Sequence, residues 1–206
     1  MPSAEADRRV EGLAVIVLAG GESRRFGSDK LVARLDGRTL LDHALDGIPA
    51  DAPIAVVGPE RPLSRVVTHL REDPPGGGPA AGLIAGLRWA LDLGATVIAT
   101  LPGDAPAGGR AAVRLADALA DPGTNALVVV AVDADEREQV LQLAMRTGVA
   151  EALLELAGPA AGHGASVRRL LHRLDPHPRP VELPKQLTAD IDSTAQLSDF
   201  RNQNGA

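Results

Sequence analysis

One glycine-rich segment near the start of the chain carries the residue types that bind phosphate. Gly20 and Gly21 are followed by Arg24 and Arg25, and Lys30 comes a few residues later. Adjacent glycines let backbone N–H groups come close to a ligand, because no side chain stands in the way. Successive N–H groups of this kind make a concave anion site, and nearby cations suit a phosphate. The segment therefore predicts a phosphate-binding loop.

Three well-known motifs do not fit this segment. A P-loop needs Gly-Lys-Ser/Thr, but Lys30 stands three places after Gly27 and neither Ser nor Thr follows it. The dinucleotide fingerprint Gly-x-Gly-x-x-Gly is missing, because Gly20 and Gly21 are adjacent. Arg25 replaces the closing glycine of a nucleophile elbow. The segment is thus a different phosphate loop, and an ordinary glycine-rich turn with surface cations is the alternative.

A second group suited to chemistry is the aspartate in Pro102-Gly103-Asp104-Ala105-Pro106, which follows an apolar run. A carboxylate at the end of a buried strand is well placed to hold a hard cation such as Mg²⁺. Aspartate is also common as a helix N-cap or in a turn, and these are the alternatives here. The neighbouring phosphate loop favours the metal site.

Further carboxylates stand beside glycines or near the end of the chain. Asp73 is followed by a glycine and proline run and then at once by helical sequence, so we expect a loop held against a ligand rather than a linker. Asp190-Ile191-Asp192-Ser193 offers a second ligand for Mg²⁺. A turn role for Asp73, and helix capping by Asp192 or Ser193, remain open alternatives.

The composition limits the classes of function. A chain of 206 residues is long enough for one α/β domain, which we expect at 12–201 between an N-terminal tail (1–11) and a C-terminal tail (202–206). The net charge of −6 argues against nucleic-acid or membrane-surface binding, both of which need a basic field. The chain has no cysteine and no apolar stretch of membrane-spanning length. We therefore expect a cytoplasmic protein.

Apolar runs that alternate with helical patterns predict the elements that position these groups. Strands are expected at 13–18, 54–57, 66–70, 96–101, 126–132, 140–145 and 181–183, and helices at 38–48, 80–93, 110–119, 149–156, 167–174 and 194–200. This order predicts a single three-layer α/β domain with a mostly parallel central sheet. Ligands lie beyond the carboxyl ends of the strands in such sheets, so the three polar loops should meet at one edge.

The pattern Leu18-Ala19-Gly20-Gly21-x-Ser-x-Arg-Phe-Gly-x-Asp29-Lys30 closely resembles the signature of nucleotidyltransferases that make nucleotide sugars and cofactors. It is most similar to the molybdenum cofactor guanylyltransferase (MobA-like) branch, which implies a Rossmann-like nucleotidyltransferase fold. The Asp104 segment resembles the family's Pro-Cys-Asp-x-Pro motif, whose aspartate binds magnesium and nucleotide. Asp73 with Gly78-Pro79-Ala80-Ala81-Gly82 resembles the family's second nucleotide motif.

The resemblance implies a magnesium-dependent enzyme that transfers GMP from GTP to molybdopterin and releases pyrophosphate. Lys30 and Arg25 would neutralise the β- and γ-phosphates, and Asp104 would complete the catalytic set. The implied metal ligands are Asp104 and Asp192. The implied nucleotide-binding residues are Leu18, Ala19, Gly20, Gly21, Lys30, Asp73, Gly78, Gly82 and Asp104. Transient contact with molybdoenzyme maturation proteins is also implied.

Two departures from the family pattern concern the base. Asp190 and Asp192 stand where the guanylyl branch has asparagines, and they look more like the cytidylyltransferases that act on the same pterin. In the loop after the second strand, the family has an asparagine that contacts guanine. This chain has Gly58, Pro59 and Glu60 there instead. We expect guanine, with CTP as the alternative. An NTP transferase acting on a different phosphorylated small molecule is a further candidate. From another class of function, the chain could be a non-catalytic nucleotide-binding partner in molybdoenzyme maturation.

Overall fold

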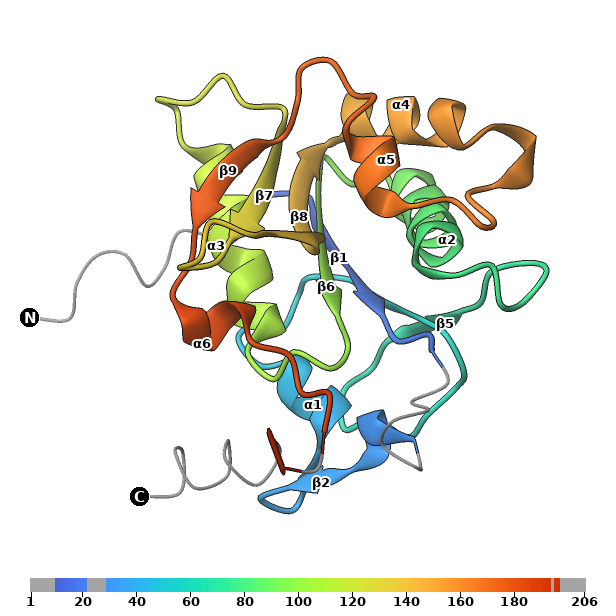
Figure 1. The fold of residues 1–206 in the computed structure, drawn as a ribbon, viewed down its shortest axis with the longest axis vertical. Coiled ribbons are helices and arrows are strands. Elements are labelled where there is room, and N and C mark those ends of the chain that lie inside the picture. Colours follow the sequence, from blue (N-terminus) through green and yellow to red (C-terminus); the bar gives the residue numbers. More distant parts are fainter. Residues whose placement is uncertain (1–9, 22–28, 194, 197–206) are drawn as a thin grey trace, which may run out of the picture.

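The computed structural model describes residues 10–21, 29–193 and 195–196. Within these residues a seven-stranded sheet, in the order β5-β4-β1-β6-β8-β7-β9, forms the centre of the molecule (Figure 1). Its strands are β1 (Leu13–Leu18), β4 (Ile54–Val57), β5 (Thr68–Leu70), β6 (Val97–Pro102), β7 (Val128–Val132), β8 (Glu138–Arg146) and β9 (Arg179–Glu182). A separate hairpin contains β2 (Arg34–Leu35) and β3 (Arg38–Thr39).

Helices cover both faces of the sheet. They are α1 (Leu40–Ala44), α2 (Pro79–Asp92), α3 (Gly108–Ala120), α4 (Thr147–Ala157), α5 (Val167–Leu171) and α6 (Lys185–Thr188), with 3-10 turns η1 (Lys30–Val32) and η2 (Gly158–Ala160). Strand β8 runs antiparallel to β6 and β7, whereas β5, β4, β1 and β6 pair in parallel and β7 pairs in parallel with β9. The expected three-layer α/β fold with a mostly parallel sheet is confirmed.

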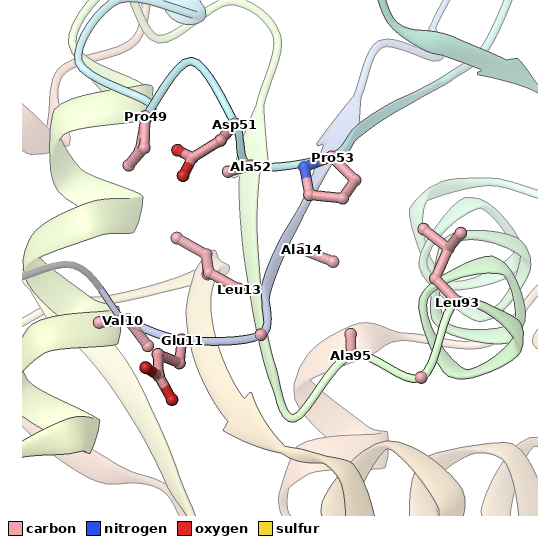
Figure 2. A pocket seen from close by; sticks show the side chains of 12 residues that line it. Val10, Glu11, Leu13, Ala14, Pro49, Asp51, Ala52, Pro53, Leu93 and Ala95 are labelled. Atoms are coloured by element: carbon pink, nitrogen blue, oxygen red, sulfur yellow. The ribbon is translucent and has the colours of Figure 1, made fainter.

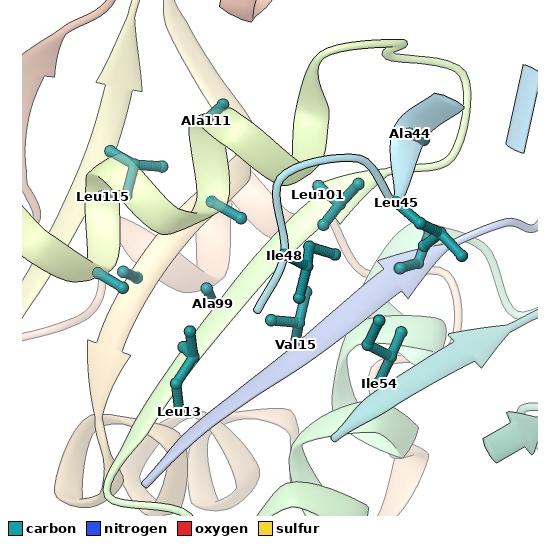
Figure 3. Close-up of a cluster of buried hydrophobic side chains, with 14 of the residues drawn as sticks. Leu13, Val15, Ala44, Leu45, Ile48, Ile54, Ala99, Leu101, Ala111 and Leu115 are labelled. Carbon is teal, nitrogen blue, oxygen red and sulfur yellow. The ribbon is translucent and has the colours of Figure 1, made fainter. Parts of the chain in front are cut away.

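The two cores follow from the alternation of side chains along β1. Leu13, Val15 and Val17 pack with α1 and α3 on one face, as Figure 3 shows for Leu13 and Val15. Ala14, Ile16 and Leu18 pack with α2, α4 and α5 on the other. Because both faces are covered, β1 is apolar at every position rather than at every second one, and all of its residues are buried.

The helix expected at 38–48 is wrong at both ends. Thr39 caps α1 through a capping box with Asp42, so the helix begins only at Leu40, and Arg38 pairs with Leu35 in the hairpin. The helix ends at Ala44, and Gly47 has a φ of 86°, which a helix cannot contain.

Strand β8 leaves its neighbours beside the carboxyl end of β6. In the ladder with β7, Val130 pairs with Leu143 but Ala131 pairs with Gln139, so residues 140–142 form a bulge. The ladder with β6 ends at Thr100, whose hydroxyl donates to the carbonyl of Leu141 instead. The bulge therefore opens the sheet beside the predicted site.

The end of the chain differs from expectation as well. The helix α6 was not expected, and the expected helix at 194–200 lies outside the described residues except for 195–196. Most of the two expected tails also lies outside them, so the boundaries of the 12–201 domain remain a prediction. No helix among the described residues has both the length and the apolar character needed to cross a membrane.

Candidate active site

A cavity of about 700 Å³ lies where β1, β4 and β6 reach their carboxyl ends. This volume is within the range of small-molecule sites, about 300–1,000 Å³. Six of the predicted nucleotide-binding residues line it: Leu18, Gly20, Gly21, Gly78, Gly82 and Asp104. The expected convergence of the three polar loops is therefore present in the structure.

Lys30 contacts two aspartates that come from distant parts of the chain. Its Nζ lies 2.6 Å from Asp104 Oδ2 and 2.8 Å from Asp192 Oδ1. Burial alone would lower the pKa of Lys30, but hydrogen bonds and charge attraction from both carboxylates outweigh it and raise the pKa above its ordinary value. Lys30 is thus held as a cation between the two predicted metal ligands.

The helix-capping alternative for Asp104 is wrong. Helix α3 has Ala107 at its N-cap without a side-chain cap bond, so Asp104 does not cap it. Next to Asp192, Ser193 Oγ accepts a hydrogen bond from the N–H of Gln196, and Gln196 Oε1 accepts one from the N–H of Asp192. The helix expected after Asp192 lies mostly outside the described residues, so capping by Asp192 or Ser193 stays an open alternative.

A third carboxylate, Asp190, lies in the same cluster and lines the cavity. Burial, followed by the negative charges of Asp192 and Asp104, raises the pKa of Asp190. The backbone N–H of Ile191 donates to the Asp104 carbonyl at 3.0 Å. The side chain of Ile191 is buried with Leu35 and Leu40. This anchor holds the terminal segment against the β6 loop.

The glycine-rich loop before α2 also lines the cavity. Gly78 is the N-cap of α2, has a φ of 85° and makes no side-chain cap bond. The uncapped N–H groups of the first helical turn, with the helix dipole, favour an anion at this point. Gly82 lines the cavity one turn further on, where an added Cβ would lie 3.4 Å from the Leu18 side chain.

Asp73 is placed differently from its neighbours in this loop. Its side chain is exposed, and the described lining residues include Arg71 and Glu72 rather than Asp73. Glu72 Oε1 accepts a hydrogen bond from the N–H of Gly76, which shapes the loop. A nucleotide-binding role for Asp73 stays a prediction.

Two residues of the site region were missed by sequence reasoning. Gln142, in the β8 bulge, lines the cavity; its Nε2 donates to the Leu187 carbonyl, and its buried Oε1 has no partner in the described part of the chain. A glutamine within an apolar strand was the available signal. Arg61 is buried and bonds to residues on both sides of the glycine loop, for which the sequence offers no local signal.

Some predicted features cannot be located in the described structure. Arg24 and Arg25 lie outside the described residues.

In the part of the chain that is described, no group of three or more His, Cys, Asp or Glu side chains is arranged to hold a metal ion. Magnesium usually takes only one or two protein carboxylates, with waters and substrate phosphates as its other ligands. Asp104 and Asp192, which meet at one Lys30 nitrogen, fit that requirement.

A second cavity, of about 740 Å³, lies at the amino ends of β1, β4 and β6 (Figure 2). Its described lining includes the carboxylates of Glu11 and Asp51 and no Lys, Arg or His. A triphosphate needs cations or aimed N–H groups, and ligands of such sheets bind at the carboxyl ends of the strands. The cavity beside Lys30 is therefore the candidate active site.

Comparison with known proteins shows the family of this chain. Residues 15–178 match the MobA-like NTP transferase domain. Over 193 residues the chain is 32% identical to a probable molybdenum cofactor guanylyltransferase from Mycolicibacterium paratuberculosis (strain ATCC BAA-968 / K-10), which covers 90% of this chain and 93% of that protein. A molybdenum cofactor guanylyltransferase from Acidiphilium cryptum (strain JF-5) is 37% identical over 107 residues, about half of each chain (49% and 55%).

The fold is also shared with a solved structure. Molybdopterin-guanine dinucleotide biosynthesis protein A from Archaeoglobus fulgidus superimposes with a TM-score of 0.67 and 18% identity, over 93% of this chain and 98% of that one. At this identity the likeness concerns the fold.

Proposed function

Since this chain belongs to the MobA-like NTP transferase family, we propose that it transfers GMP from GTP to molybdopterin and releases pyrophosphate. The observation that carries the proposal is the contact of Lys30 with both Asp104 and Asp192 beside a cavity lined by Gly20 and Gly21. The names of relatives at 32–37% identity support the choice of nucleotide and acceptor.

The reaction needs positioned charge rather than a protein nucleophile. An oxygen of the acceptor phosphate attacks the α-phosphorus of GTP, the bond from that phosphorus to the bridging oxygen breaks, and pyrophosphate leaves with the electron pair. The backbone N–H groups of Gly20 and Gly21 would hold the phosphates, and the Lys30 ammonium would stabilise the charge that develops on the leaving group.

Asp104 and Asp192 would hold the metal ion that this chemistry uses. A bound Mg²⁺ supplies positive charge to the phosphate oxygens. The two carboxylates are the hard oxygen donors that this ion prefers. Lys30 contacts both carboxylates, and the Asp190 carboxyl lies nearby.

The cavity is lined by two chemically different groups of residues. Glycine-rich backbone from the loops of Gly20 and Gly78 forms one wall, which suits the triphosphate. The other wall is the β8 bulge with Gln142, together with Thr188 and Asp190. The polar side chains of this second group suit an acceptor rich in N–H donors, as a pterin is.

Guanine is the proposed base. Gly58 fits so closely against the Ala19 carbonyl that an added Cβ would lie 2.5 Å from its oxygen, so no asparagine fits at this position. Base recognition would then fall to the Arg71–Gly82 loop. The acidic pair Asp190 and Asp192 favours the cytidylyl alternative, which therefore stays the second candidate.

Competition among GTP, CTP and ATP for the magnesium-loaded protein tests the base. A site built to hydrogen-bond one base edge leaves buried polar groups unpaired with another, so we expect GTP to bind about 10²-fold more tightly. A preference for CTP would assign the chain to cytidylyl transfer, and equal affinities would contradict base recognition at this cavity.

The proposal extends to the surroundings of the enzyme. The cytoplasm would supply the nucleoside triphosphate. Molybdoenzyme maturation proteins would receive the product through a transient contact. Co-purification from a cytoplasmic fraction with a molybdoenzyme maturation protein tests both.

A further inference from the structure

Arg61 is a buried arginine beside the glycine loop. It follows β4 and its side chain is only 6% exposed. Its Nε donates to Asp29 Oδ2 at 2.6 Å, and its Nη1 donates to the carbonyls of Ala19 at 2.9 Å and Pro59 at 3.0 Å. A buried guanidinium is tolerated only when such partners satisfy its charge and its donors.

The partners of Arg61 lie on both sides of the glycine loop. Ala19 directly precedes the cavity-lining Gly20 and Gly21. Asp29 directly precedes Lys30, and its second oxygen, Oδ1, accepts from the N–H of Leu31 at the start of η1. One guanidinium therefore ties the strand that enters the loop to the turn that carries Lys30.

The β4 exit loop is shaped to bring Arg61 to this place. Gly58 has a φ of 150°, and its Cα lies so close to Ala19 and Gly20 that a Cβ would stand 2.5 Å from the Ala19 oxygen and 2.9 Å from the Gly20 nitrogen. This close approach presses the exit loop against the end of β1. The Pro59 carbonyl then accepts from the same Nη1 that reaches Ala19.

We propose that Arg61 is a positioning residue for nucleotidyl transfer. By holding Ala19 and Asp29 together, it sets the place of the Lys30 ammonium relative to the Gly20 and Gly21 backbone. Both groups must act on one triphosphate, so their separation decides how well the leaving pyrophosphate is stabilised. This inference rests on the proposed function, and it requires an arginine, because the single point charge of lysine cannot reach acceptors in several directions.

The test compares Arg61→Lys with Arg65→Lys. Arg65 lies in the same segment and is partly buried. It donates hydrogen bonds to the backbone carbonyls of Ile48 and Pro49, which do not line the cavity beside Lys30. Misplacement of a catalytic group by about 1 Å can reduce the rate about 10²-fold. We expect Arg61→Lys to lower kcat for pyrophosphate release about 10–10²-fold with a smaller change in KM. Arg65→Lys should lower the melting temperature but keep kcat.

A double-mutant cycle with Lys30 tells positioning from a merely structural role. If Arg61 acts through Lys30, Arg61→Lys should change kcat less than about threefold in a Lys30→Met background, because groups that act as a unit are not additive. Full additivity, or an equal kcat loss in Arg65→Lys, would overturn the proposal.

Binding of inorganic triphosphate, measured by calorimetry, keeps the inference separate from the proposed function. Arg61→Lys should weaken this binding by a smaller factor than it lowers kcat, since the Lys30 ammonium and the loop N–H groups no longer meet the same anion. If the wild-type protein binds triphosphate but shows no turnover, the proposed function fails while the role of Arg61 is still tested. Native triphosphate affinity in folded Arg61→Lys would overturn the positioning role.

Discussion

Lys30 Nζ donates a 2.8 Å hydrogen bond to Asp192 Oδ1, although the two residues are 162 positions apart in the sequence. The same nitrogen contacts Asp104 at the end of β6. The cluster of Lys30, Asp104 and Asp192 therefore joins three segments that are far apart in the sequence. Ile191, which is only 2% exposed, packs with Leu35 and Leu40 and holds Asp192 near Lys30.

Replacing Lys30 by methionine should abolish most turnover. The loss of one preorganised electrostatic contact commonly costs about 10²–10³ in rate. Lys185→Met is the matched control, because Lys185 is an exposed lysine on α6. Pyrophosphate release by the two purified variants gives the comparison, and near-native release by Lys30→Met would rule out the proposed role.

Asp104→Asn should weaken binding of magnesium GTP more than binding of GTP without the metal. An amide oxygen is a poorer ligand for a hard cation than a carboxylate. Calorimetric titration with and without Mg²⁺ measures the difference, with Asp121→Asn, in an exposed turn, as control. Equal losses in both titrations would leave Asp104 as a partner of Lys30 alone.

Gly58→Ala should destabilise the fold more than Gly94→Ala. Both glycines have a positive φ, but a Cβ at Gly94 meets nothing within 4 Å, whereas one at Gly58 meets the Ala19 carbonyl at 2.5 Å. We expect a cost of about 1–2 kcal/mol for the strained φ of Gly94→Ala. Gly58→Ala should cost about 1–3 kcal/mol more for the clash. Urea unfolding tests this order, and equal costs would contradict the close approach.

Asp42 should make the stability depend on pH at acid values. Burial alone would raise the pKa of Asp42, but hydrogen bonds from Ser64 and Thr39 outweigh it and lower the pKa below its ordinary value. A lowered folded-state pKa adds stability above the unfolded value, about 3.9, which is lost as the pH falls through the folded value. The stability difference between wild type and Asp42→Asn should therefore shrink below about pH 4. A difference that stays constant from pH 7 to pH 3 would refute this.

The parts of the site that were predictable from sequence are those with a local signal. Gly20 and Gly21 follow an apolar strand, and Asp104 follows another, so their meeting at one edge follows from parallel pairing. Arg61 has no such signal, because its partner Asp29 is 32 positions away and nothing nearby indicates that the guanidinium is buried. The pattern at 140–145 predicts a strand, but the bulge that brings Gln142 to the cavity depends on pairing with β7. The short α1 was mispredicted because its apolar stripe continues past the true end at Ala44.

We expect this protein to catalyse GMP transfer to molybdopterin. The most direct measurement is pyrophosphate release with GTP and Mg²⁺, with and without molybdopterin, together with mass analysis of the pterin. We predict acceptor-dependent release of one pyrophosphate for each GMP joined to the pterin, and its loss in Lys30→Met. Tight binding of GTP with no pyrophosphate released in the presence of molybdopterin would contradict the account and favour a non-catalytic nucleotide-binding protein.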